Sequence, residues 1–197
     1  MATDSNIDRI VSFWFDPRYP YRRWFIKSPA LDAEIKSEFG PLVLAARTTK
    51  TLDHWAQSPG GCLALLLLLD QFPRNIFRDS ADAYLSDQKA LTTATQAIAQ
   101  GFDRAVPLLQ QAFFYLPFEH EEQLLSQITS VSLFEGLAAR CEAGAQEKQF
   151  ADKCVEYAIR HRDVIAKFGQ FPHRNLVLQR RSTAEELEFL KTNPLGF

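Results

Sequence analysis

Apolar residues recur along most of this chain with the 3.6-residue period of an amphipathic helix. Ile7 and Trp14 lie on one face of the first such stretch, which Asp4 or Ser5 can cap. No convincing run alternates apolar and polar residues as a half-buried strand does. The pattern therefore predicts an all-α protein of about eight or nine helices, and its length fits a single domain over residues 1–197.

Turn-forming residues divide the pattern into segments. Ser28-Pro29 and Ser58-Pro59 each have the form of an N-cap followed by a first helical residue, whereas Gly40-Pro41 predicts a kink or a break. Residues 63–69 are apolar on all sides, which predicts a central, buried helix. We expect further helices over residues 60–72, 81–100 (capped by Ser80), 107–115, 121–141 and 147–168, and a last one that begins at the capping-box residues 182–186.

The composition is that of a globular protein with a rigid core. Apolar residues make up 46% of the chain, and 16 of the 197 residues are phenylalanine. The net charge of −2 favours neither nucleic acid nor an acidic membrane as a partner. The longest near-continuous apolar run, residues 62–69, is far shorter than the roughly 20 residues that cross a bilayer.

The three cysteines, Cys62, Cys141 and Cys154, form no Cys-x-x-Cys pair. Reduced thiols are the favoured interpretation, and a Cys141–Cys154 disulfide is the alternative. The N-terminal residues carry neither the basic region nor the apolar segment of a secretion signal. We therefore expect the protein to be cytoplasmic.

Three polar runs interrupt the apolar sequence, and two of them are alike. Residues 69–75 (Leu-Asp-Gln-Phe-Pro-Arg-Asn) and 168–175 (Phe-Gly-Gln-Phe-Pro-His-Arg-Asn) each end an apolar helical stretch, and residues 115–122 lie between them. A merely structural helix would more often end in Gly or Lys. The concentration of arginines, amides, carboxylates and histidines therefore predicts a site.

These runs and three shorter segments resemble the family called domain of unknown function 924. The resemblance implies an all-helical, tetratricopeptide-like α-α superhelix of antiparallel helix pairs, and it implies no biochemical role. Glu119, where the family more often has an apolar residue, and Glu121, where it usually has Ser, depart from the pattern. The matching segments cover nearly the whole chain in the family's order: Ser12-Phe13-Trp14-Phe15, Arg23-Trp24-Phe25, residues 69–75, Tyr115-Leu116-Pro117-Phe118 with His120 and Glu122, His161-Arg162-Asp163 and residues 171–175.

Asp70 and Arg74 are four residues apart, so they share a helical face and can form an ion pair. The functional alternative is that Arg74 faces a cavity and binds an anion, because its planar guanidinium holds a carboxylate or phosphate with two hydrogen bonds. Asn75 follows Arg74, and Arg174-Asn175 repeats the chemistry. We predict that these side chains converge on one acidic small molecule or acidic peptide end, with the two guanidinium groups within roughly 15 Å.

His120 lies in an acidic cluster between the two arginine motifs. It could act as a general base, oriented by Glu122 or Asp70, and the alternative is a hydrogen-bonded histidine that caps a helix. His161 shares a face with apolar residues, so we expect it to point inward, either as a satisfied core histidine or as a ligand contact.

The aromatic residues and the two other histidines have simpler assignments. The helical spacing of Trp14 indicates a core residue, whereas Trp24, beside two arginines, is the better candidate for the wall of a ligand pocket. We expect His173 to lie in an exposed turn and His54 on the surface.

The sequence disfavours metal and cofactor chemistry. It has no His-Glu-x-x-His motif and no pair of Glu-x-x-His helices, so we predict no metal site. It also lacks a Gly-rich phosphate loop and a Gly-x-Ser-x-Gly elbow. We therefore expect no cofactor.

Three functions remain open. The leading hypothesis is a helical binding module with an internal polar pocket for a small acidic molecule or acidic peptide end. The second is a cofactor-independent isomerase, lyase or hydrolase in which His120 moves a proton while Arg74 and Arg174 stabilise charge on the substrate. The third is a structural scaffold for protein interactions. The sequence does not specify the oligomeric state.

Overall fold

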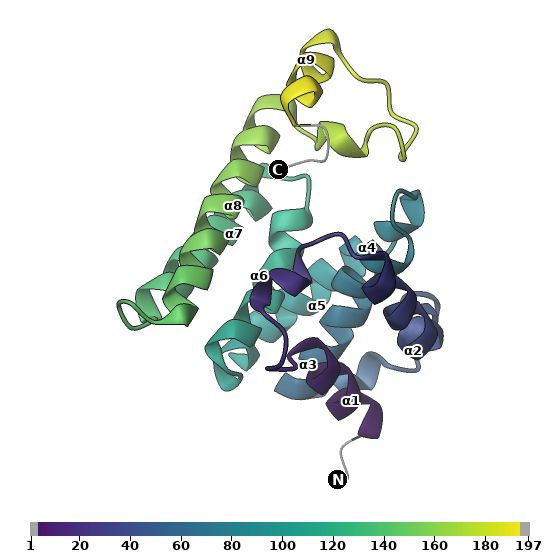
Figure 1. Cartoon of the computed structure of the whole chain (residues 1–197), viewed down its shortest axis with the longest axis vertical. Coiled ribbons are helices and arrows are strands. Elements are labelled where there is room, and N and C mark those ends of the chain that lie inside the picture. Colours follow the sequence, from purple (N-terminus) through teal and green to yellow (C-terminus); the bar gives the residue numbers. More distant parts are fainter. Residues whose placement is uncertain (1–3, 194–197) are drawn as a thin grey trace. The chain divides into compact units, whose positions relative to one another are not determined.

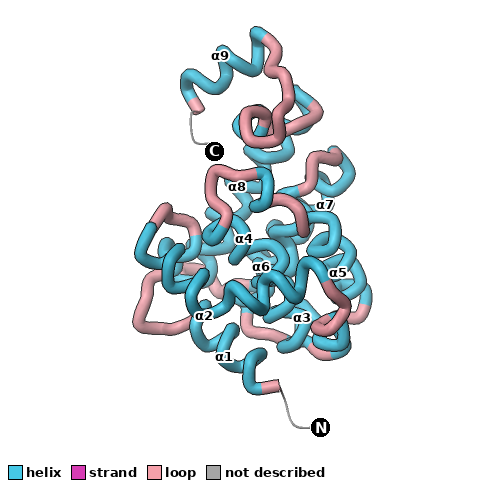
Figure 2. Tube along the Cα trace, turned by 90° about the vertical axis from the view of Figure 1, so that its right-hand side faces the viewer, coloured by secondary structure: helices cyan, strands magenta, loops and turns pink. Residues whose placement is uncertain are grey.

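The computed structural model describes residues 4–193, and every regular element in this range is a helix (Figures 1 and 2). The prediction of an all-α protein with about eight or nine helices is confirmed. None of the described helices is long and apolar enough to cross a membrane. The α-helices are α1 (Ser5–Trp14), α2 (Pro29–Thr48), α3 (Pro59–Leu66), α4 (Phe72–Ile76), α5 (Asp87–Ala99), α6 (Leu108–His120), α7 (Leu124–Arg140), α8 (Gln146–Phe168) and α9 (Ala184–Thr192).

The chain divides into two compact units. The described part of the first unit comprises residues 4–78 and 82–117, and that of the second comprises residues 79–81 and 118–193. Helix α6 begins in the first unit and ends in the second. A single domain over residues 1–197 stays a prediction.

Side-chain caps begin the helices of the first unit where the sequence predicts them. Asp4 caps α1 by accepting a hydrogen bond from the Asn6 backbone, and Ser28 caps α2 in the same way. Ser58 caps α3, whose first residue is a proline. A break at Gly40-Pro41 is wrong, because α2 continues through Pro41 to Thr48.

The helix expected over residues 60–72 contains a feature that its apolar pattern does not reveal. After α3, the residues Leu67–Gln71 form a π-helix, and α4 follows it directly. All five residues of the π-helix are buried, Asp70 and Gln71 among them. A π-turn rotates the side chains that follow it relative to those before it, and such turns often occur at functional sites.

The expected start of α5 and the expected end of α6 are wrong. Helix α5 begins at Asp87 and not at Ala81, and the residue before it is Ser86 and not Ser80. The Ser86 hydroxyl donates 2.7 Å to the Leu69 carbonyl, a tertiary contact between the residue before α5 and the π-helix. Helix α6 does not end at Tyr115 but continues to His120.

Aromatic rings form the core of the first unit. Trp14 is 2% exposed, which confirms it as a core residue, and its ring lies 5.4 Å from that of Phe72. The Phe72 ring is in turn 5.2 Å from Phe39, and the Trp14 ring is 6.1 Å from Phe113. Edge-on and tilted contacts of this kind fix side chains in one arrangement, so these rings position the polar residues that follow Phe72.

Helices α7 and α8 of the second unit pack side by side, joined by residues 141–145 (Figure 1). Gly169 ends α8 with a φ of +70°, a conformation that glycine adopts without strain. The expected capping box opens α9, where the Thr183 and Glu186 side chains each accept a hydrogen bond from the other's backbone. Helix α7 begins at Leu124, three residues later than expected.

Candidate functional site

In the first unit, Arg74 forms the predicted ion pair with Asp70. Its Nη2 lies 3.1 Å from Asp70 Oδ1 and 3.1 Å from Asp87 Oδ1, so one guanidinium serves two carboxylates. Burial alone would lower the pKa of Arg74, but the charges of Asp87 and Asp70 outweigh it and raise the pKa above its ordinary value. These contacts agree with the ion pair that the sequence predicts as one of two roles for Arg74. The other role, binding of an anion, stays a prediction.

Asn75 takes part in a second polar contact of the first unit. Its Nδ2 donates 2.8 Å to Asp32 Oδ1 in the first turn of α2, and Arg78 binds both oxygens of the same carboxylate at 2.8 Å. Burial would raise the pKa of Asp32, but the hydrogen bonds from Arg78 and Asn75 lower it. The polar run at residues 69–75 therefore ties α4 to both α2 and α5.

Trp24 packs on the aromatic core of the first unit, and its indole N–H has a hydrogen-bond acceptor. Its Nε1 donates 2.7 Å to the Trp14 carbonyl, and its ring stacks on Tyr21 at 5.5 Å. It also meets the edge of Phe113 at 5.1 Å. Its side chain is only partly buried. The role of Trp24 as a pocket wall stays a prediction.

In the second unit, polar side chains gather around the C-terminal end of α6, where the last carbonyls of a helix need partners. Gln127 of α7 donates from Nε2 to the carbonyls of Glu119 at 2.7 Å and Glu121 at 2.6 Å. Arg174 donates from Nη1 to the carbonyl of His120 at 3.0 Å. An arginine is favourable here because the helix dipole makes this end negative. His120 is therefore the last residue of α6, and the expected helix start just after it is wrong.

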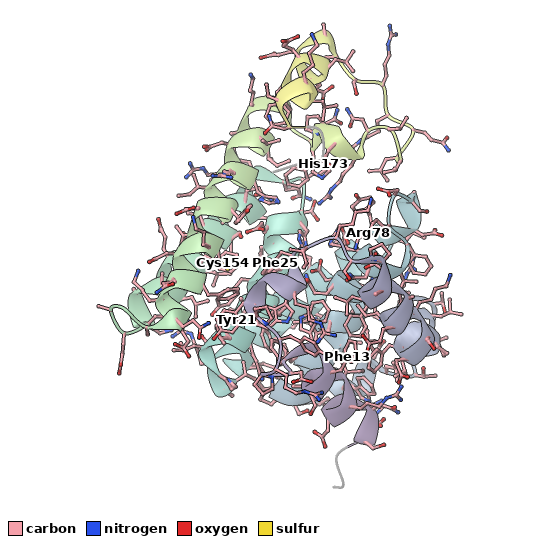
Figure 3. The ribbon with its side chains drawn as sticks, viewed as in Figure 1. Phe13, Tyr21, Phe25, Arg78, Cys154 and His173 are labelled. Carbon is pink, nitrogen blue, oxygen red and sulfur yellow. The ribbon has the colours of Figure 1, made fainter. Side chains whose placement is uncertain are left out.

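The guanidinium of Arg174 also contacts an aromatic ring. Its Cζ lies 4.4 Å from the centre of the Phe171 ring, and the side chain is 6% exposed. His173, labelled in Figure 3, lies in the same turn, with its ring 5.7 Å from Phe171. The turn is the short helix Pro172–Arg174, so the predicted turn at His173 is confirmed, but His173 is half-buried rather than exposed.

Glu122 joins this turn to the end of α6. Arg180 binds both oxygens of the Glu122 carboxylate, at 2.9 Å for Oε1, and the Phe171 backbone donates to Oε1 at 2.8 Å. Burial would raise the pKa of Glu122, but these donors lower it. The predicted role of Glu122 in orienting His120 stays a prediction.

Arg180 also holds Asn175, a predicted ligand-binding residue. Its Nε donates 3.0 Å to Asn175 Oδ1, and Asn175 Nδ2 donates 3.0 Å to Ser182. Gln179, next to Arg180, has a φ of +54°, which is uncommon for a residue with a side chain. The contacts of Arg180 stabilise this strained loop.

His161 points inward from α8, as expected. Nδ1 lies 2.9 Å from the Tyr157 carbonyl and 3.6 Å from Glu119 Oε1, and the ring meets Phe171 edge-on at 5.4 Å. Burial lowers the pKa of His161 to about 3, and the nearby His120, Arg174 and His173 lower it further against the Tyr157 hydrogen bond. The imidazole is therefore neutral at physiological pH.

The structure brings five of the predicted site residues into the second unit: His120, Glu122, His161, Arg174 and Asn175. The other four, Asp70, Arg74, Asn75 and Trp24, belong to the first unit. Convergence of Arg74 and Arg174 within roughly 15 Å stays a prediction.

Sequence reasoning missed the partners of these residues. Asp32 could have been suspected as an acidic residue in the first turn of a helix. Asp87 and Arg180 carry no local signal, because their partners are 13 and 58 residues away. Gln127 occupies an ordinary core-facing position of a helix, and nothing nearby in the sequence marks it as a cap for α6.

No group of three or more His, Cys, Asp or Glu residues within 4–193 is placed to hold a metal ion. The three cysteines are free thiols, so the Cys141–Cys154 disulfide is wrong. Burial raises the pKa of Cys62 to about 12, which makes that thiol a poor nucleophile.

Comparison with known proteins agrees with the motifs. Residues 10–194 match the family described as bacterial protein of unknown function (DUF924). The chain belongs to this family. A solved structure of a protein of unknown function from Agrobacterium tumefaciens is similar to this DUF924 protein over 98% of this chain and 100% of that one, with 36% identity and a TM-score of 0.82. No curated protein matches the chain.

Proposed function

We propose that this DUF924 protein is a binding module whose second unit takes a small acidic molecule or an acidic peptide end beside the C-terminal end of α6. The observation that carries the proposal is the setting of His161. A guanidinium and two further imidazoles lie close enough to disfavour a positive charge on this ring. Of these groups Arg174 is a permanent cation with a side chain that is only 6% exposed, and its attraction for an anion is weakly screened in such a setting.

The position of Arg174 supports the same function. Its guanidinium is fixed by the His120 carbonyl and the Phe171 ring, so little side-chain entropy is lost when an anion binds. A carboxylate near Arg174 would also offset the charges that lower the pKa of His161. Binding should then raise that pKa from its value of about 3.

Calorimetric titration with succinate and citrate tests the proposal. Binding should be lost in Arg174→Gln and largely kept in Arg174→Lys, which retains a charge at the end of α6. Arg162→Gln, at a surface position paired with Asp163, is the matched control. Binding of neither acid to the wild-type protein, or equal binding to Arg174→Gln, would contradict the proposal.

The enzymatic alternative places the proton transfer at His120, in the same cluster. His161 is unsuited to that task, because a base with a pKa of about 3 does not take up protons at neutral pH. His120→Ala should abolish turnover of an acidic substrate while leaving the melting temperature nearly unchanged. Loss of folding in this variant would indicate a structural residue.

The proposal also covers the type of helical fold and the cellular compartment. The pairing of α7 with α8 supports the tetratricopeptide-like arrangement of antiparallel helix pairs that the family resemblance implies. Three free thiols support a reducing compartment, and hence the cytoplasm. A scaffold without a ligand is the remaining alternative, and failure of all acid titrations would favour it.

A further inference from the structure

Helix α7 buries two polar atoms for which residues 4–193 supply no hydrogen-bond partner, Gln127 Oε1 and Ser130 Oγ. Both residues are 0% exposed. Burying such a group without a partner is destabilising, and native proteins leave few of them unexplained. The two residues are three apart and therefore neighbours on one helical face. Together they are two buried acceptors that a hydrogen-bond donor from outside the chain would satisfy.

The amide of Gln127 has only one sensible orientation. Its Nε2 donates to three carbonyls at the end of α6, those of Phe118, Glu119 and Glu121, at 3.3, 2.7 and 2.6 Å. In the flipped orientation an oxygen would face three oxygens. Oε1 is therefore an acceptor that these three carbonyls leave without a partner.

The hydroxyl of Ser130 is unusual for its place in a helix. Buried Ser and Thr hydroxyls commonly bond to the carbonyl four residues earlier. The neighbouring Thr129 does so, donating 2.8 Å to Leu125. Ser130 makes no such bond, so its hydroxyl can serve as a second acceptor.

A third acceptor group lies in the same unit. Glu119 is 5% exposed, and its Oε1 lies 3.6 Å from His161 Nδ1. Gln127 binds the Glu119 carbonyl directly, which places the two residues side by side. An amide oxygen, a hydroxyl and a carboxylate in a buried setting suit a primary ammonium, which has three N–H donors and a positive charge.

We propose that the ligand of the second unit is an amino acid or another acid that carries an amino group, with its ammonium accepted by Gln127 Oε1 and Ser130 Oγ and its carboxylate directed to Arg174. This inference rests on the proposed function and narrows its ligand class. Gln127 and Arg174 bind successive carbonyls of the same helix end, so the amide that carries Oε1 and the guanidinium lie at neighbouring residues of α6.

A comparison of glutamate with glutarate separates recognition of the amino group from binding of the acid, because glutarate lacks only the amino group. Calorimetry on the full chain should show glutamate binding at least about tenfold more tightly, which corresponds to about 1.4 kcal/mol. Ser130→Ala should lower the glutamate affinity by about that factor and leave the glutarate affinity unchanged. Ser132→Ala, at an exposed position of α7, is the matched control and should change neither.

Each other result overturns the inference. If the two acids bind with equal affinity and Ser130→Ala changes neither affinity, the acceptors hold water and not an ammonium. The inference would then be wrong, but the proposed binding of an acid would not be contradicted. A Ser130→Ala variant that is more stable to urea and binds glutamate normally would show that the hydroxyl is an unused buried group. Binding of neither acid would overturn both the inference and the proposed function.

Discussion

At the residue scale, His161 is a base that burial and cationic neighbours keep neutral. Its pKa of about 3 in the folded state compares with an ordinary value of 6.5. The unfolded chain binds the proton more readily, so the contribution of His161 to stability is fully present above pH 6.5 and is lost as the pH falls towards 3. Acid should therefore destabilise the protein partly through this residue.

His161→Gln tests this prediction. The variant cannot take up a proton at that position, so its free energy of unfolding should fall less steeply than that of the wild type between pH 6.5 and 4. Urea unfolding at several pH values measures the slope. His54→Gln, at an exposed position as the sequence predicts, is the control. Parallel slopes for His161→Gln and the wild type would show that His161 is not protonated on unfolding.

Arg74 is the second residue with a measurable energetic role. Arg74→Leu would leave the carboxylate of Asp70, which is 1% exposed, without its ion-pair partner. We expect a loss of about 3–5 kcal/mol in the free energy of unfolding. Adding Asp70→Asn should recover part of this loss, because the charge at the buried position 70 is then removed, while Asp87 keeps its charge. A double variant as unstable as the sum of the two singles would contradict the pairing.

At the element scale, the end of α6 depends on side chains that come from other helices. Pro117 lies inside α6, and the last turn beyond it continues to His120. Proline within a helix normally costs about 3 kcal/mol or more. The hydrogen bonds from Gln127 and Arg174 to the final carbonyls stabilise this turn. A helix boundary is thus decided by groups that are distant in sequence.

Gln127→Leu should therefore destabilise the second unit. It removes the donor that three carbonyls at the end of α6 share, at a position that is 0% exposed. We expect a loss of at least about 1–3 kcal/mol, measured by urea unfolding. Gln149→Leu, at an exposed position of α8, is the matched control and should change stability little. A fully stable Gln127→Leu variant would indicate that water replaces the amide.

At the scale of the whole molecule, the three tryptophans allow a test of the single-domain prediction. Trp14, Trp24 and Trp55 all lie in the first unit, so tryptophan fluorescence reports that unit alone. Circular dichroism reports the helices of both units. If residues 1–197 fold as one domain, urea unfolding followed by the two signals should give coincident transitions. Separate midpoints would show that the two units unfold independently.

The similarity to the Agrobacterium tumefaciens protein also belongs at this scale. At 36% identity over 98% of this chain, the two proteins share a fold. Glu119, which the resemblance predicts to depart from the usual family pattern, lies in the last turn of α6, where the candidate site is found. Binding preferences of the two proteins should therefore be compared rather than assumed to be equal.

The sequence by itself determined the helical class, most helix starts and the family. Periodic apolar positions and caps such as Ser28, Ser58 and Thr183 act over a few residues, so they can be recognised without a structure. The sequence also identified the polar runs that carry Arg74 and Arg174.

Only the tertiary structure decided what those runs contact. Arg74 binds Asp87, the first residue of a helix that begins later than expected. Glu122 binds Arg180, which is 58 residues away in the sequence. The π-helix at Leu67–Gln71 and the capping of α6 by Gln127 likewise depend on neighbours from other helices. Such contacts depend on how packed helices bring distant residues together, and a periodic pattern records which face is buried but not which partner lies against it.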